Sequence, residues 1–378
     1  MDFNLSKEQE LLRDGLTKFL STRYDLEKSR SAAKTGAGWQ PEIWRSFADE
    51  LGILGATFGE DVGGIGGGPV ELMVITEALG HALVVEPYVD VVVVCGGLLQ
   101  RAGGQRATSL LEEVVAGTAI VALAAGEAES GDRWQDAATT AERDGDGWVL
   151  NGGKTMAMTA PLATHLLVTA TTPEGLSLFL VDLKSVTAGL SLAGYRTVDD
   201  RRAADLVLEG LLLPADALLG KEGQAWPSLE QARDEGAAAV CSEAVGCMRK
   251  VLADTVEYCK QRQQFGVPIG SFQVLQHRMV DMHIEVEQAF AAVLLAVLHL
   301  EDEPALRARS VSAAKATVGR AARFVGQQAV QLHGGMGMTE ELAIGHYFKR
   351  LTAMQFEFGT TDHHIGRYAA LSRLDAPA

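Results

Sequence analysis

The sequence YCKQRQQFGVPIGSFQ, from Tyr258 to Gln273, carries the most information about the architecture of the chain. Its first residues end a long segment with helical apolar spacing, and Pro268 interrupts that helix. Ser271 offers a side-chain oxygen that can cap the next helix. The stretch therefore predicts two helices joined by a bend that carries Arg262 and Phe265. A forked guanidinium at such a bend suits a phosphate, although arginines at helix ends are more often simply solvated.

A second stretch, Gln331 to Glu340, reads QLHGGMGMTE and follows another helical segment. The first stretch contains Arg-x-x-Phe-Gly and Pro-Ile-Gly, and the second contains Gln-x-x-Gly-Gly-x-Gly. Together, in this order and at this spacing, they resemble the acyl-CoA dehydrogenase family of flavoproteins. The resemblance extends to the N-terminal helices and the middle segment, so it covers nearly the whole chain.

Composition sets the limits for these interpretations. The chain has 378 residues, of which 47% are hydrophobic and 22% charged, with a formal net charge of −16. This length suits two or three domains with cores of their own. The acidic balance argues against a nucleic-acid-binding protein, which would show a basic face. The longest apolar runs are too short to span a membrane, and no signal peptide is visible. The four cysteines show no metal-ligand spacing, so we predict a cytoplasmic protein without a metal site.

The apolar pattern changes twice along the chain and predicts three domains: a helical domain at 1–115, a β-domain at 116–222 and a helical bundle at 223–378. Ser6 and Gln9 form a capping box that opens the first helix. The middle segment contains short runs of strand type and a hairpin signal at Asp144–Gly147, as in a small barrel or sandwich. The bundle contains helices at about 237–258, 272–300 and 305–332. By resemblance, this α+β order of helices, β-domain and four-helix bundle is the acyl-CoA dehydrogenase fold.

The resemblance implies FAD as the cofactor and an acyl-CoA thioester as the substrate. In this family the bend with the arginine reaches across a subunit interface to the FAD pyrophosphate, and the glycine-rich segment contacts the adenine end. The residues that the resemblance assigns to the cofactor are Met158, Thr159, Arg262, Gln264, Phe265, Gln331, Leu332, Gly334, Gly335, Thr360 and Asp362.

The middle domain departs from the family pattern beside the flavin. The family carries a Thr or Ser four residues after the Lys of its Asn-Gly-x-Lys motif, and here that Lys is Lys154. This chain has Met158 at the hydroxyl position and Thr159 one residue later. The contacts to the edge of the flavin ring are therefore expected to differ from the common pattern.

The catalytic base also departs from the pattern. The family reaction needs a carboxylate against the carbon next to the thioester, usually a Glu directly before Gly-Thr. Phe358 stands at that position, and Glu357 lies one residue away, which turns its side chain to a different face. Some family members carry the base on the first bundle helix, where Glu235 is the nearby candidate. We expect Glu243 to make a structural hydrogen bond, and we expect His363 and His364 to be surface histidines rather than acid–base groups.

These departures indicate a subset of the family. The chain looks closest to the small, base-lacking subunit type found in pimeloyl-CoA dehydrogenase and other α2β2 heterotetramers. The resemblance thus implies a homo- or heterotetramer with electron-transfer flavoprotein as the electron acceptor. Two alternatives stay open. The chain can be a partner subunit without activity of its own, or a relative that uses flavin for oxidation by oxygen or for hydroxylation. Coenzyme A binding would separate the last class from the others.

Overall fold

The computed structural model describes residues 5–131 and 133–374, and they divide into two compact units. The first unit combines Met1–Leu26, Pro69–Val84 and Ala237–Ala378, and the second combines Glu27–Gly68 with Val85–Gly236. The first unit therefore joins stretches from both ends of the chain. The three consecutive domains drawn from the sequence stay a prediction.

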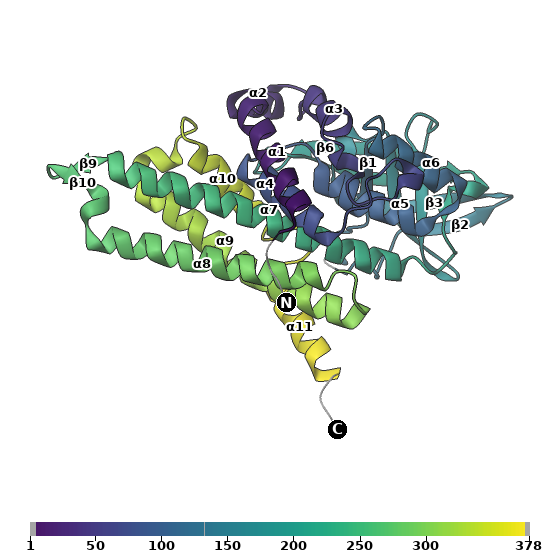
Figure 1. Ribbon diagram of the computed structural model, residues 1–378. Helices are drawn as coiled ribbons and strands as arrows, with labels where there is room; N and C mark the ends of the chain where they lie inside the picture. Colours follow the sequence, from purple (N-terminus) through teal and green to yellow (C-terminus); the bar gives the residue numbers. More distant parts are fainter. Residues whose placement is uncertain (1–4, 132, 375–378) are drawn as a thin grey trace. The chain divides into compact units, whose positions relative to one another are not determined.

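The first unit is helical. Its helices are α1 (Lys7–Arg23), α4 (Pro69–His81), the part of α7 (Trp226–Gln261) from Ala237 onward, α8 (Gln273–Leu298), α9 (Pro304–His333), α10 (Ala343–Ala353) and α11 (Thr361–Leu374). The long helices α8 and α9 pack along each other, as Figure 1 shows. The three long bundle helices that the apolar spacing predicts are present, and α11 is a helix that the spacing did not reveal.

Helix α1 begins where the capping box predicts. The Ser6 hydroxyl accepts a hydrogen bond from the Gln9 backbone N–H at 3.3 Å, and the Gln9 side chain accepts one from the Ser6 N–H at 2.9 Å. Two backbone donors at the helix start are thereby satisfied. The buried side of the helix consists of Leu16, Phe19 and Leu20.

Helices α4 and α7 approach each other closely because glycines lie at their crossing. A Cβ atom at Gly246 would come within 2.0 Å of the Glu77 carbonyl oxygen, and one at Gly80 would come within 2.0 Å of the Glu243 carbonyl oxygen. The Cys247 thiol, one residue after Gly246, donates to the Gly80 carbonyl at 3.1 Å. Only glycine lets these two backbones meet.

The second unit combines short helices with a sheet. Its helical elements are α2 (Leu26–Thr35), α3 (Pro41–Asp49), η1 (Ile53–Gly55), η2 (Glu60–Val62), the π-helix η3 (Val89–Gly96), α5 (Gly97–Ala102) and α6 (Gly104–Val115). The apolar run around Val91–Val94 forms the buried π-helix. The described residues include no helix with the length and apolarity that crossing a membrane requires.

The sheet has eight strands in the order β6-β7-β3-β2-β4-β5-β8, with β1 pairing in parallel to β4. The strands are β1 (Val121–Ala124), β2 (Thr140–Asp144), β3 (Gly147–Met158), β4 (His165–Thr172), β5 (Gly175–Asp182), β6 (Leu190–Arg196), β7 (Arg202–Leu213) and β8 (Leu218–Leu219). The β2–β3 pair confirms the hairpin signal, because Asp144 pairs with Gly147 around a two-residue turn.

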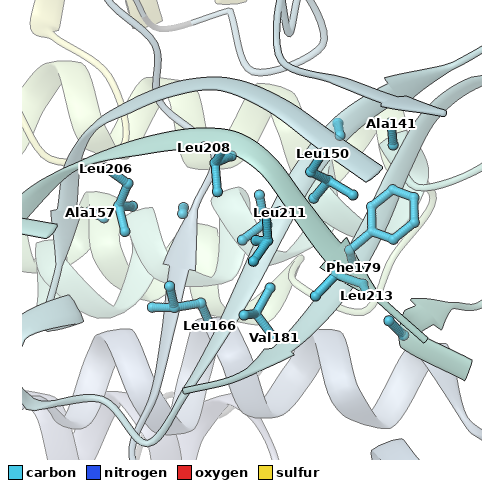
Figure 2. Packing of buried hydrophobic residues seen from close by; sticks show 14 of the residues in the cluster. Ala141, Leu150, Ala157, Leu166, Phe179, Val181, Leu206, Leu208, Leu211 and Leu213 are labelled. Carbon is cyan, nitrogen blue, oxygen red and sulfur yellow. The ribbon is translucent and has the colours of Figure 1, made fainter. Parts of the chain in front are cut away.

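The sheet curls around a single apolar core. Leu150 of β3, Leu166 of β4, Phe179 of β5 and Leu208 of β7 all belong to one buried cluster, shown in Figure 2. Strands that are distant in the sheet order thus pack their side chains together, which agrees with the predicted small barrel or sandwich.

The α4–α7 crossing gives a prediction for stability. We expect Gly246→Ala to lower the free energy of unfolding by about 3 kcal/mol, because the added methyl meets backbone atoms that cannot move independently. Denaturation in guanidinium chloride measures the change. Gly15→Ala in α1 is the control: no atom lies within 4 Å of its Cβ position, so it should stabilise by about 0.5–1 kcal/mol. Equal unfolding midpoints for Gly246→Ala and the wild type would contradict the close crossing.

Candidate functional site

The bend after α7 is a β-hairpin that presents an aromatic ring to solvent. Strands β9 (Gln263–Gln264) and β10 (Val267–Pro268) pair antiparallel around Phe265 and Gly266, whose φ angles are 55° and 81°. Two positive φ values in a two-residue turn are typical of tight hairpins, yet a bulky residue adopts the first only with strain. Phe265 is 92% exposed. A strained and exposed aromatic side chain at a hairpin tip is a candidate ligand contact.

The polar residues of the hairpin are exposed as well. Arg262 and Gln264 both face solvent. The Ile269 N–H donates to the Arg262 carbonyl at 2.8 Å, which closes the hairpin behind the guanidinium. The expected cap at Ser271 is wrong. Its hydroxyl donates instead to the Pro268 carbonyl at 2.7 Å, and α8 starts without a side-chain cap.

The glycine-rich stretch lies against the end of α7. Helix α9 ends at His333, and a 3-10 turn, η7, follows at Gly334–Met338. The His333 ring stacks on the Tyr258 ring with a centroid separation of 4.3 Å, and the Tyr258 hydroxyl lies 3.4 Å from the His333 carbonyl. The structure therefore brings the two stretches that carry the family resemblance to the same end of the bundle.

The assigned residues of this second stretch differ in exposure. Gln331, Gly334 and Gly335 are exposed, whereas the Leu332 side chain is buried. Gly334 has φ 60° and ψ −141°, a conformation open only to glycine. An exposed cation, an aromatic ring and a bare glycine backbone together fit a ligand that carries phosphates and a flat ring system.

The candidate base Glu357 lies in the segment between α10 and α11, where an arginine holds it. Buried Arg350 of α10 donates to Glu243 of α7 through Nε and Nη2, both at 2.9 Å. The same guanidinium donates to Glu357 through Nη1 and through Nη2, the latter at 3.1 Å. Glu243 thus has the structural role expected of it. Glu357 would have to leave Arg350 before it could approach a substrate carbon.

His364 is buried, so the expectation that it is a surface histidine is wrong. This residue lies in the first turn of α11 and has no exposed surface. Its Nε2 lies 3.0 Å from the Phe358 carbonyl, and its Nδ1 lies 3.3 Å from the Ser312 hydroxyl. Since a carbonyl only accepts, Nε2 carries the proton and Nδ1 accepts from Ser312. The histidine is thereby a neutral buried link between α9, α11 and the segment.

The start of α11 carries the last two residues assigned to the cofactor in this unit. The Thr360 hydroxyl accepts from the His363 backbone N–H at 3.1 Å and so caps the helix. Asp362 lies exposed in the first turn. A helix start offers further backbone donors to a polar ligand.

In the second unit, Met158 ends strand β3 and Thr159 directly follows it. Met158 is partly buried, and Thr159 is buried with its hydroxyl donating to Asp90 at 3.1 Å. Two residues before Met158, Met156 is 57% exposed with φ 54°, beside an irregularity in the β3–β7 pairing. Of the two assigned residues, Met158 is therefore the one more open to a ligand.

A buried ion pair fixes strand β3 at Lys154, four residues before Met158. The Lys154 ammonium donates to Glu127 at 2.5 Å and to the Thr169 hydroxyl at 3.0 Å. Burial lowers the pKa of Lys154, and Glu127 opposes that effect. Burial alone would raise the pKa of Glu127, but the hydrogen bond and charge of Lys154 outweigh it and hold this pKa below its ordinary value. Lys154 belongs to the Asn-Gly-x-Lys motif, and nothing in the local sequence pattern revealed its partner.

Glu235 also has an arginine partner. Its carboxylate accepts two hydrogen bonds from Arg101 of α5, at 2.9 and 3.0 Å, and a third from Gln231 at 3.0 Å. Both candidate bases are thus held by guanidinium groups. Arg101 was missed because it lies 134 residues from Glu235. Arg350 lies only seven residues from Glu357, but the chain leaves helix α10 between them, so helical spacing does not predict their pairing.

The burial of His364 gives a pH prediction. Burial, with smaller effects from the charges of Lys315 and Arg367, lowers the pKa of His364 from 6.5 to about 3. The unfolded chain therefore takes up a proton between these values and the folded chain does not. Stability is fully present above about pH 6.5 and is lost as the pH falls, by up to about 1.4 kcal/mol per pH unit.

We expect His364→Gln to flatten this loss between pH 6.5 and 4.5, as urea unfolding at a series of pH values would measure. His283→Gln is the control, because it makes the same substitution at a largely exposed histidine. An unchanged slope in His364→Gln would show that His364 titrates normally in the folded protein.

Comparisons with known proteins identify the family. Three family models match consecutive parts of the chain: the acyl-CoA dehydrogenase N-terminal domain at residues 6–118, the middle domain at 122–210 and the C-terminal domain at 223–371. Acyl-CoA dehydrogenase FadE12 of Mycobacterium tuberculosis is 30% identical over 90% of this chain and 89% of its own length.

Two solved structures have the same fold. The butyryl-CoA dehydrogenase of Megasphaera elsdenii superposes with a TM-score of 0.88 and 25% identity, covering 99% of this chain and 100% of that chain. The ChsE4–ChsE5 complex of Mycobacterium tuberculosis gives a TM-score of 0.89 and 26% identity, with both chains covered completely. The chain belongs to the acyl-CoA dehydrogenase family of oxidoreductases.

Proposed function

We propose that this chain binds FAD and oxidises the α,β carbon–carbon bond of an acyl-CoA thioester. Bound FAD would supply the hydride acceptor. The protein has to bind the thioester, position the cofactor and take up the proton from the α-carbon. The observation that carries the proposal is the stacking of Tyr258 on His333, which joins the hairpin and the glycine-rich turn at one end of the bundle.

Within this proposal, Arg262 donates to the pyrophosphate, and Gln264 and Phe265 contact the cofactor beside it. The exposure of all three supports a contact with a ligand outside their own fold, across a subunit interface. The glycine-rich stretch would receive the adenine end. Gly334 and Gly335 offer backbone without side chains there, Gln331 offers an amide, and Leu332 can contribute only its backbone.

The remaining cofactor contacts are proposed at the start of α11 and at the end of β3. Thr360 and Asp362 offer a hydroxyl and a carboxylate beside backbone donors at the helix start. Met158 would replace the usual hydroxyl with a thioether against the ring edge. The Thr159 hydroxyl already donates its proton to Asp90, so its contact would use its backbone or the hydroxyl oxygen as an acceptor.

For the proton we propose Glu357 first and Glu235 second. Each is the carboxylate nearest to a position where the family carries its base. Each also forms two hydrogen bonds with an arginine, so the thioester would have to draw the carboxylate away from Arg350 or Arg101. A carboxylate that is freed only by the substrate would be protected from other reactions in the empty enzyme.

A second candidate is the small-subunit type, in which another chain supplies the base within an α2β2 tetramer. Two observations favour this candidate. Phe358 occupies the position where the family usually carries its catalytic Glu, and the carboxylates of Glu357 and Glu235 are both paired with arginines. The similarity to the ChsE4–ChsE5 complex, which is named for two chains, supports a heteromeric assembly. Electron-transfer flavoprotein is the proposed acceptor in both cases. The four described cysteines are buried and form no disulfide, which supports the proposed cytoplasmic location.

The pyrophosphate role of Arg262 has a direct test. We expect Arg262→Ala to weaken FAD binding by about 10- to 100-fold, because it removes a charge-assisted contact worth about 1.5–3 kcal/mol. Titration of the apoprotein with FAD measures the affinity. Lys260→Ala removes the same charge two residues earlier, where Lys260 is 67% exposed and pairs with Glu257, and should change the affinity little. Equal FAD affinity in Arg262→Ala and the wild type would exclude the role.

The origin of the base is tested on the chain purified alone with FAD. If the chain has its own base, its flavin absorption bleaches when acyl-CoA thioesters of different chain types are added without oxygen. We expect Glu357→Gln to slow the bleaching by about 100- to 10,000-fold and Glu235→Gln to slow it less. A flavin that binds but stays oxidised with every thioester would instead support the small-subunit candidate, and bleaching should then appear on addition of the missing chain.

A further inference from the structure

A buried ammonium group lies beneath the segment between α10 and α11. Lys315 of α9 is 2% exposed. Its Nζ donates to the carbonyls of Met354 at 2.9 Å, Gln355 at 3.4 Å and Gly359 at 3.0 Å. An ammonium carries three donors, and here they meet three carbonyls. Two of these carbonyls directly follow the end of α10, where the last carbonyls of a helix lack partners and attract a cation.

The segment contains a strained turn at the point where Lys315 holds it. Phe358 has φ 57° and Gly359 has φ 111°. A bulky side chain enters the left-handed region only where its surroundings determine the conformation. At Gly359, a side chain would collide with His364, because a Cβ atom there would lie 2.9 Å from the His364 Nε2. The same Nε2 donates to the Phe358 carbonyl.

A different set of contacts holds the side chains of the segment between α10 and α11. The Phe358 ring packs against a buried cluster that includes Ala237 and Ala238 of α7 and Ala314 of α9. Glu357 is held by Arg350 of α10. The carbonyls are thus fixed by α9 and α11, while the side chains are fixed by α7, α9 and α10. Such agreement between independent contacts is what a strained backbone needs to persist.

The turn controls where α11 begins. Gly359, whose carbonyl binds Lys315, directly precedes Thr360, and the Thr360 hydroxyl caps the helix. A shift of Gly359 would therefore move Thr360 and the first turn with Asp362. We propose that Lys315 is a positioning residue for the cofactor: its buried ammonium fixes the Phe358–Gly359 turn and thereby the helix start that Thr360 and Asp362 offer to FAD. The inference rests on the proposed function for the roles of these two residues.

The test compares Lys315→Met with Lys349→Met in the full chain, at a temperature where circular dichroism shows both to be folded. Lys349 lies on α10 and takes no part in the described hydrogen bonds of the segment. We expect Lys315→Met to raise the dissociation constant for FAD about 10-fold or more, as replacement of supporting residues typically does, and to shift the visible spectrum of the bound flavin. Lys349→Met should do neither. Unchanged affinity and spectrum in Lys315→Met would overturn the proposal.

A second measurement separates this inference from the proposed function. Hydrogen–deuterium exchange in the peptide that covers 356–364 should be faster in Lys315→Met even without FAD, and unchanged exchange would overturn the inference. A wild-type chain that binds no FAD would refute the proposed function, whatever the exchange shows.

If Lys315→Met does not fold, Lys315→Ala refolded with ethylammonium chloride replaces it. Recovery of FAD affinity in proportion to the amine concentration would support positioning. Recovery of the fold without recovery of FAD affinity would reduce Lys315 to a structural cap and overturn the proposal.

Discussion

The buried guanidinium of Arg350 holds together the parts of the helical unit on which the chemistry depends. It forms two hydrogen bonds with Glu243 on α7, directly at the crossing where the Glu243 carbonyl lies against Gly80 of α4. It also holds Glu357 in the segment that leads to α11. Burying these charges costs desolvation energy, so the network adds less to stability than to orientation. Its effect is to set one arrangement of α7, α10 and the segment between α10 and α11.

Two phenylalanines in left-handed conformations, Phe265 and Phe358, mark the functional parts of this unit. Phe265 makes an edge contact with Phe272 of its own bend, at 6.3 Å between ring centroids, and it faces solvent. Phe358 is held from several sides and packs inward. The strained Phe265 is thus accessible to a ligand or a neighbouring chain, whereas the strained conformation of Phe358 is supported by the fold around it. Both positions lie beside residues proposed to touch FAD.

The sequence revealed features whose causes are local. The capping box at Ser6, the hairpin at Asp144–Gly147 and the long bundle helices depend on neighbouring residues, and the structure confirms them. The short helix α11 was missed because its glycine and two histidines hide the apolar spacing. The burial of His364 and the pairing of Arg101 with Glu235 depend on how distant parts of the chain fold against each other. The pairing of Arg350 with Glu357, seven residues apart, depends on the path of the chain after α10. No local pattern encodes these contacts, and the candidate site could therefore be predicted in its motifs but not in its ion pairs.

The discontinuous composition of the helical unit has a consequence for biosynthesis. Helices α1 and α4 leave the ribosome early and pack on each other, as the hydrogen bond from Gln9 to Glu71 shows. Their partners on α7 and α8 are translated only after the second unit, which ends at Gly236, is complete. During that interval apolar surface on α1 and α4 stays uncovered, a condition that favours chaperone binding and aggregation. Chains that stop before α7 should therefore be cleared by quality control rather than accumulate as a stable N-terminal fragment.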